Sequence, residues 1–101
     1  MDKREIVKEL EKEKKKFYLE IARHLKKCPG VNVRKIDMLA KENETIIVPG
    51  KVIGNGKMSK KIKIYAYGFS AGAEKSIKEA NGTVENMESF IKNKEIGRII
   101  I

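Results

Sequence analysis

The sequence contains one cysteine, Cys28, among its 101 residues. A single cysteine cannot form an internal disulfide, so the chain is not a disulfide scaffold, and a reducing compartment is favoured. No apolar run approaches the roughly 18 residues that a membrane helix needs. Residues 1–16 alternate acid and base and lack the apolar segment of a signal peptide. We therefore expect a protein without a membrane partner.

Residues that carry catalysis or bind metals are also scarce. His24 is the only histidine, so a zinc site has no ligand set, and no cofactor is expected. A nucleophile at Ser70 has no histidine in the globular part of the chain to act as its base. No two C-terminal glutamates are marked as a catalytic pair, so we expect neither an enzyme nor a small-molecule substrate. These glutamates are Glu74, Glu79, Glu85 and Glu88.

Carboxylates are missing from residues 45–73 altogether. The chain has a net charge of +9, of which this segment contributes +5 and residues 1–28 contribute +4, while the remaining segments are neutral. The alternative is that this stretch is simply strand and turn, and strands are poor in acids in any case. Five ammonium groups close together nevertheless repel one another unless an anion neutralises them, so the pattern predicts a polyanionic partner. The five lysines are Lys51, Lys57, Lys60, Lys61 and Lys63.

Composition and length predict one folded domain with an arm. Apolar residues make up 41% of the chain and charged residues 37%, and 101 residues support a single core. We expect a basic N-terminal helical arm over residues 1–28 and a compact mixed α/β domain over residues 29–101. In the arm, hydrophobic periodicity predicts one helix over residues 5–27. Lys14 interrupts its apolar stripe, so we expect the helix to bend there.

Short strands and helices alternate in the rest of the chain. We expect an extended piece at residues 31–33, followed by a short helix that directs Leu39 inward. Ser70 and Asn86 are in position to cap two further helices, and Asn81-Gly82 is in position to end the first of them in a left-handed conformation. The other predicted strands comprise residues 45–48, 62–69 and 97–101.

A glycine-rich segment lies inside the acid-free stretch. Pro49-Gly50 is predicted to end a strand, with an extended continuation through Val52 and Ile53 as the alternative, and Gly54-Asn55-Gly56 is predicted to form a turn. The glycine spacing fits neither a Walker loop nor a dinucleotide fingerprint, and a strand rather than a helix follows it. Flanked by Lys51 and Lys57, the segment could bring its backbone close to a sugar-phosphate chain. A plain bulge and turn is the alternative.

The strand at residues 62–69 carries aromatic side chains. Its sequence Lys63-Ile-Tyr-Ala-Tyr-Gly-Phe69 partly resembles the signature of the RNA-recognition motif, in which strand-borne aromatics stack on bases. No partner strand carries the second signature of that motif. Tyr65 and Tyr67 are therefore candidate RNA contacts, with a place in the core as the alternative.

Residues 47–56, Ile-Val-Pro-Gly-Lys-Val-Ile-Gly-Asn-Gly, carry a more specific signal. They resemble a motif of the archaeal and eukaryotic large-subunit ribosomal proteins of the "eighteen-e" family, relatives of bacterial large-subunit protein fifteen. The resemblance continues in order from residue 22 to residue 101. Its other matching positions include Val31-Asn32-Val33, Ile36, Phe69-Ser70, Ala73, Ile77 and Gly82.

The resemblance implies an α/β fold in which strand-strand-helix units form an irregular superhelix. It also implies a structural constituent of the large ribosomal subunit, without catalytic activity and located on the cytoplasmic ribosome. The implied partners are large-subunit ribosomal RNA and neighbouring ribosomal proteins, with the chain present as a monomer within the ribosome. Two other functions stay open: an RNA- or DNA-binding regulator outside the ribosome, and a small enzyme such as a nuclease.

Residue chemistry and resemblance together define a candidate RNA-binding surface. The five lysines of residues 45–73 form its main part, because lysine contacts phosphate as a point charge. Four further cations form a second part: Arg23, Lys26, Lys27 and Arg34. The residues expected to shape the loop are Pro49, Gly50, Gly54 and Gly56.

Overall fold

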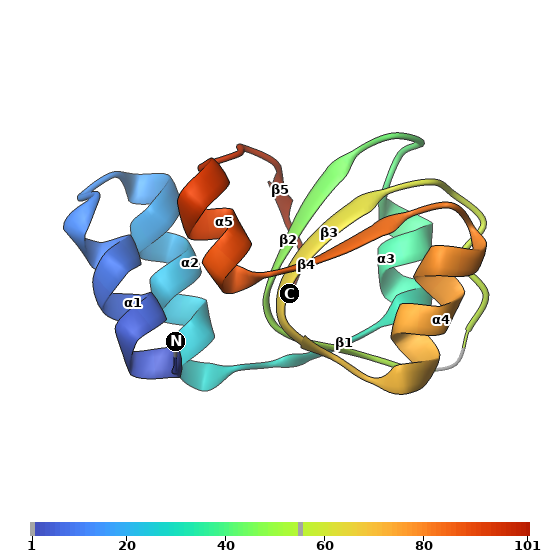
Figure 1. Ribbon diagram of the computed structural model, residues 1–101, viewed down its shortest axis with the longest axis horizontal. Coiled ribbons are helices and arrows are strands. Elements are labelled where there is room, and N and C mark those ends of the chain that lie inside the picture. The colour runs from blue at the N-terminus through green and yellow to red at the C-terminus, as the bar shows by residue number, and fades with distance from the viewer. Residues whose placement is uncertain (1, 55) are drawn as a thin grey trace.

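The computed structural model describes residues 2–54 and 56–101, which form a five-stranded sheet with helices on both faces. The elements are α1 (Lys3–Lys12), α2 (Lys16–Lys27), β1 (Gly30–Asn32), α3 (Val33–Leu39), β2 (Thr45–Ile53), β3 (Lys63–Phe69), α4 (Ala71–Glu79), β4 (Thr83–Asn86), α5 (Met87–Asn93) and β5 (Arg98–Ile99). Helices α1, α2 and α5 cover one face of the sheet, and α3 and α4 cover the other (Figure 1).

The two central strands are buried on both faces because their side chains alternate between two cores. In β2, Ile46 and Val48 pack toward α3 and α4, while Ile47 packs toward α1, α2 and α5. In β3, Ile64 packs on the first side and Tyr65 on the second. Burial of both faces explains why these segments are apolar without a polar alternation.

All the strand pairs are parallel, and the first four strands are neighbours in sequence order. Helix α3 connects β1 to β2, residues 54–62 connect β2 to β3, and α4 connects β3 to β4. Each connection returns the chain to the same edge of the sheet, so the chain winds as an irregular coil (Figure 1). The predicted α/β fold class is confirmed.

The helix caps at Ser70 and Asn86 form where the sequence predicts them. The Ser70 hydroxyl accepts a hydrogen bond from the Ala73 N–H at 3.2 Å, and the Asn86 carboxamide accepts one from the Ser89 N–H at 2.8 Å. Asn81, which follows α4, has a φ of 64°, so the left-handed stop is confirmed as well. These short-range signals therefore placed the starts of α4 and α5 correctly.

The predicted single helix over residues 5–27 is wrong, because the chain reverses and forms the antiparallel pair α1 and α2 (Figure 1). Lys14 has a φ of 55° between the two helices. An unbroken helix would place this lysine in the apolar stripe. The reversal instead exposes Lys14 and lets the stripes of both helices, including Leu10 and Ile21, enter one core.

The predicted strand end at Pro49-Gly50 is also wrong, and the alternative, an extended continuation through Val52 and Ile53, is confirmed. Both residues are buried inside β2, which continues to Ile53 through a register shift between Val48 and Lys51. The strand continues because its second half gains β1 as a new parallel neighbour. The following turn is partly described: Gly54 has a φ of 105°, while Asn55 lies outside the described residues.

Three smaller expectations also differ from the structure. Val33 begins α3 instead of extending β1, because Asn32 caps the helix by accepting a hydrogen bond from the Arg34 N–H. Leu39 is exposed rather than directed inward. The short strand β4 had no counterpart in the predicted elements, because its sequence Thr-Val-Glu-Asn has only one apolar residue.

Candidate nucleic-acid interface

Arg34 and the loop after β2 meet at the carboxyl edge of the sheet. Strands β1 and β2 end side by side, with Asn32 opposite Ile53. A Cβ atom on Gly56 would lie 2.7 Å from the Arg34 Cγ, so only glycine lets the loop approach this closely. Lys57 follows directly in the chain. The structure therefore brings Arg34 beside the lysine-bearing loop.

Three of the five central lysines carry charges that no carboxylate of the described residues neutralises. The side chains of Lys51, Lys57 and Lys61 are exposed, and no described carboxylate lies within 4 Å of their ammonium groups. Lys60 is held differently, because its ammonium donates a hydrogen bond to the main-chain oxygen of Asp37 on α3.

Lys63 is the exception among the central lysines. Its ammonium lies 2.8 Å from Glu95 Oε1 and 5.0 Å from the centre of the Tyr65 ring. The carboxylate of Glu95 raises the pKa of Lys63, and Lys63 together with the Thr45 hydroxyl lowers the pKa of Glu95. The acid-free stretch is thus partly neutralised by a carboxylate from the C-terminal part of the chain.

The second predicted group of cations is divided by the fold. Arg23 pairs with Glu20 at 3.3 Å and Lys26 with Glu11 at 3.2 Å, all on the α1–α2 pair. Lys27 is exposed and has no carboxylate partner among the described residues. Arg34 lies across the sheet from these residues, on α3 (Figure 1).

Two of the four residues expected to shape the loop have a different role. Pro49 and Gly50 are buried, and a Cβ atom on Gly50 would lie 2.0 Å from the Pro29 oxygen. Gly50 therefore allows β2 to pack against the segment before β1 and presents no backbone to a ligand. Gly54 and Gly56, in contrast, belong to the loop itself.

Tyr65 and Tyr67 are also separated by the fold. Tyr65 is fully buried, and its ring packs edge-on against Phe90 with the ring centres 5.4 Å apart. It is therefore a core residue and no candidate for stacking on a base. Tyr67 is 40% exposed on the same strand.

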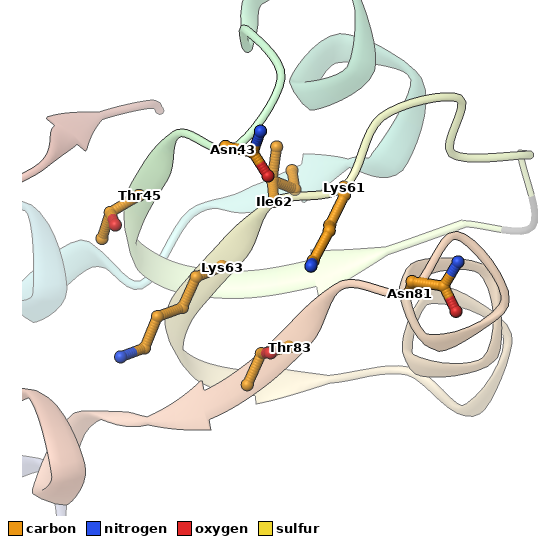
Figure 2. A pocket seen from close by; sticks show the side chains of 7 residues that line it. All are labelled: Asn43, Thr45, Lys61, Ile62, Lys63, Asn81 and Thr83. Carbon is orange, nitrogen blue, oxygen red and sulfur yellow. The ribbon is translucent and has the colours of Figure 1, made fainter.

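Two polar clusters were not among the site residues predicted from the sequence. Lys14, Lys15 and Lys16 lie exposed at the α1–α2 turn, without a carboxylate partner among the described residues. Asn43-Glu-Thr45 and Asn81-Gly-Thr83, each of which ends on the first residue of a parallel strand, lie beside Lys61 and Lys63 around one pocket (Figure 2). The repeated Asn-x-Thr pattern was visible in the sequence, but only the parallel register shows that both copies border the same pocket, one on each side of β3.

Two negative findings concern other classes of site. Among residues 2–54 and 56–101, no three His, Cys, Asp or Glu side chains are grouped so that they could hold a metal ion. The same residues include no helix with the length and apolarity needed to cross a membrane.

Fold and charge define a small basic α/β domain with uncompensated cations at the edges of a parallel sheet, which is the charge pattern of polyanion-binding proteins. The chain belongs to a ribosomal protein family. The family model that describes the ribosomal proteins 50S-L15 and 50S-L18e, together with their 60S counterpart, matches residues 20–85. The resemblance drawn from the sequence is confirmed.

Several archaeal relatives carry the name large ribosomal subunit protein eL18. That of Archaeoglobus fulgidus is 43% identical over 67 residues, covering 66% of this chain and 57% of the relative. That of Nanoarchaeum equitans is 35% identical over 99 residues, covering 92% of this chain and 84% of the relative. The matched part of this chain thus spans little more than half of the Archaeoglobus protein and most of the Nanoarchaeum protein.

Proposed function

We propose that this chain is a structural constituent of the large ribosomal subunit, located on the cytoplasmic ribosome, and that it binds large-subunit ribosomal RNA. Family membership and the names of the archaeal relatives support this role. Neighbouring ribosomal proteins are further partners, the chain acts as a monomer within the ribosome, and no catalytic step is part of the proposal.

The observation that carries the RNA-binding part is the uncompensated charge of the central lysines. Lys51, Lys57 and Lys61 have exposed ammonium groups without carboxylate partners among the described residues, and Lys60 donates only to a neutral main-chain oxygen. An RNA backbone neutralises such charges and releases its condensed counterions, which is favourable at moderate salt. Arg34 adds a fifth cation beside the loop.

The remaining predicted residues contribute less directly. Lys63 is held by Glu95, so we assign it to positioning β3 and to the local field. Arg23, Lys26 and Lys27 form a second RNA contact on α2, weakened by the pairing of the first two with glutamates. Both assignments follow from charge compensation within the protein.

The test is to replace Lys51, Lys57 and Lys61 together by glutamine and to measure binding to large-subunit ribosomal RNA at several salt concentrations. We expect weaker binding and a logarithmic salt dependence that is shallower by about 0.7–0.9 per lost phosphate contact, or about 2–3 in total. The matched control replaces Lys75, Lys78 and Lys92, which lie on α4 and α5, and loses the same formal charge. Equal slopes for the two triple variants would refute the central surface.

An RNA- or DNA-binding regulator outside the ribosome is the alternative, because the same lysines would neutralise any nucleic acid. Gradient sedimentation of native extract separates the two functions. A ribosomal constituent sediments almost entirely with large subunits, whereas recovery mainly from the light fractions would favour the regulator.

A further inference from the structure

Three segments in register line a pocket of about 200 Å³ at the amino edge of the sheet. The first residues of three adjacent parallel strands lie side by side: Thr45 of β2, Lys63 of β3 and Thr83 of β4. Two residues earlier in each segment, a second row lines the same pocket. That row consists of Asn43, Lys61 and Asn81. Figure 2 shows the two rows, with both lysines in the middle and Asn-x-Thr on each side.

Main-chain hydrogen bonds extend the ladder to the second row on the β2 side and hold the start of β4 beside Ile62. The Asn43 N–H donates to the Lys61 oxygen at 2.7 Å, and the Thr83 N–H donates to the Ile62 oxygen at 3.0 Å. Ile62, between the two lysines, belongs to the core on the other face. Because side chains two residues apart in extended chain share a face, Lys61 and Lys63 lie on the same side of the sheet, opposite Ile62. Asn43 and Asn81 stand in turns, and both line the same pocket as the two lysines.

The donors of this pocket are unused by the protein. The carboxamides of Asn43 and Asn81, the hydroxyl of Thr83 and the ammonium of Lys61 have no hydrogen-bond or ion-pair partner among the described residues. Both asparagines have positive φ values, 63° and 64°. Asparagine tolerates this conformation and, unlike glycine, adds a side-chain amide to the site.

Carboxylates lie near both rows, and the first row is the more strongly neutralised. Glu95 accepts hydrogen bonds from the Lys63 ammonium and the Thr45 hydroxyl. Glu85 lies on the same face of β4, two residues beyond Thr83. An anion at the first row would therefore compete with Glu95 for the ammonium group of Lys63.

At the second row a neighbouring carboxylate, that of Glu42, binds the main chain. Glu42 accepts a hydrogen bond from the Lys61 N–H at 3.1 Å, but it makes no ion pair with the Lys61 ammonium. Figure 2 shows the Lys61 side chain extending into the pocket, whereas that of Lys63 points away from it. An anion is therefore most favourably bound at the second row, by Lys61.

We propose that this pocket binds a single phosphate of the RNA backbone, with Lys61 as the cationic contact and Asn43, Asn81 and Thr83 as neutral donors. Phosphate oxygens in RNA commonly accept hydrogen bonds from lysine ammonium, amide and hydroxyl groups. The inference rests on the proposed RNA binding and adds a defined contact to an otherwise diffuse surface charge.

The test compares RNA binding by four single variants over a salt series. Lys61→Met should lower the affinity and make the logarithmic salt dependence shallower by about 0.7–0.9. Asn81→Gly, which keeps the positive φ accessible, and Thr83→Val should each weaken binding about fivefold without changing the slope, because neutral donors release no counterions. Thr83→Ser restores the hydroxyl and should bind like the wild type. Thermal melting confirms that each variant is folded.

Two comparison variants separate failure of the pocket from failure of the proposed function. Lys57→Met removes a lysine of the same loop outside the pocket, and Lys75→Met removes an ion-paired lysine on α4. If Lys57→Met weakens binding while Asn81→Gly and Thr83→Val do not, the pocket is refuted and the RNA-binding surface stands. If Lys57→Met, Lys61→Met and Lys75→Met all bind like the wild type, the RNA-binding surface fails as well.

A second arm distinguishes RNA phosphate from free phosphate. Inorganic phosphate is titrated into the protein while backbone amide NMR signals are followed. We expect millimolar phosphate to shift the amide signals of residues 61–63 and 81–83, and we expect Lys61→Met to abolish these shifts. Ribosomal RNA should displace the bound phosphate. Phosphate binding that RNA does not displace would overturn the proposal, because the pocket would then take a free anion.

Discussion

The carboxylate of Glu95 lies 2.8 Å from the ammonium of Lys63, although 32 residues separate the two in the sequence. The same carboxylate accepts hydrogen bonds from the Tyr65 hydroxyl at 3.0 Å and from the Thr45 hydroxyl at 2.8 Å. Glu95 lies between α5 and β5, so these bonds attach that connection to β2 and β3. The contact thereby positions β5 for its pairing with β2.

Replacing Glu95 by glutamine should lower the free energy of unfolding by about 1 kcal/mol at neutral pH, since a partly exposed, charge-assisted network is lost. Lys63 and Thr45 lower the pKa of Glu95, so its stabilising contribution is fully present above the ordinary value of 4.5. It is lost as the pH falls through the lowered pKa. Denaturant unfolding from pH 7 to pH 3 measures the difference between wild type and variant.

The control for Glu95→Gln is Glu74→Gln, which breaks an exposed pair between Glu74 and Lys78 on α4. Such a pair contributes about 0.3–0.5 kcal/mol, so the control should be nearly neutral. A gap between wild type and Glu95→Gln that widens on acidification would contradict the assigned direction of the pKa.

Gly50 and Gly68 lie on neighbouring strands and should respond oppositely to a methyl group. At Gly50 the added Cβ would lie 2.0 Å from the Pro29 oxygen, a main-chain atom that cannot rotate away. At Gly68 its nearest neighbour would be the Lys51 Cγ at 3.8 Å, an ordinary contact. We expect Gly50→Ala to lower the free energy of unfolding by about 3 kcal/mol and Gly68→Ala to lower it by less than about 1 kcal/mol, as measured by thermal unfolding. Similar costs for both would show that β2 does not pack tightly against Pro29.

Features that depend on a few consecutive residues were predictable from the sequence. Ser70 and Asn86 cap their helices, and Asn81 takes the left-handed conformation, because each acts on backbone groups within three residues. The phase of β3 was predictable for the same reason, with Ile64 and Tyr65 on opposite faces. The family resemblance placed these pieces in the right fold class.

Features that depend on pairing between distant segments were not predictable from local patterns. Pro49-Gly50 has the composition of a strand end, yet β2 continues because β1 supplies a partner. Tyr65 has the spacing of an exposed aromatic, yet α5 covers it. The neutralisation of Lys63 by Glu95 and the meeting of Asn43 with Lys61 likewise require the parallel register.

Phe90 joins the N-terminal helices to the sheet. It is fully buried on α5, with ring centres 5.9 Å from Tyr18 on α2 and 5.4 Å from Tyr65 on β3. Ile6 and Leu10 of α1 are buried in the same cluster. We therefore predict that α1 and α2 are ordered without RNA and unfold together with the sheet.

Hydrogen exchange on the RNA-free protein tests this prediction with two core variants. Phe90→Ala should lower the free energy of unfolding by about 3–5 kcal/mol. Ile77→Ala, in the core on the opposite face, should lower it by about 2–5 kcal/mol. If the chain is one cooperative unit, Ile77→Ala lowers the protection of α2 amides by the same free energy as it lowers that of β3. Met38→Ala, at a side chain that is 80% exposed, should change the protection of neither α2 nor β3. Rapid exchange of α2 in the wild type, or α2 protection that Ile77→Ala leaves intact, would instead show that the N-terminal helices form a separate unit whose order depends on the RNA.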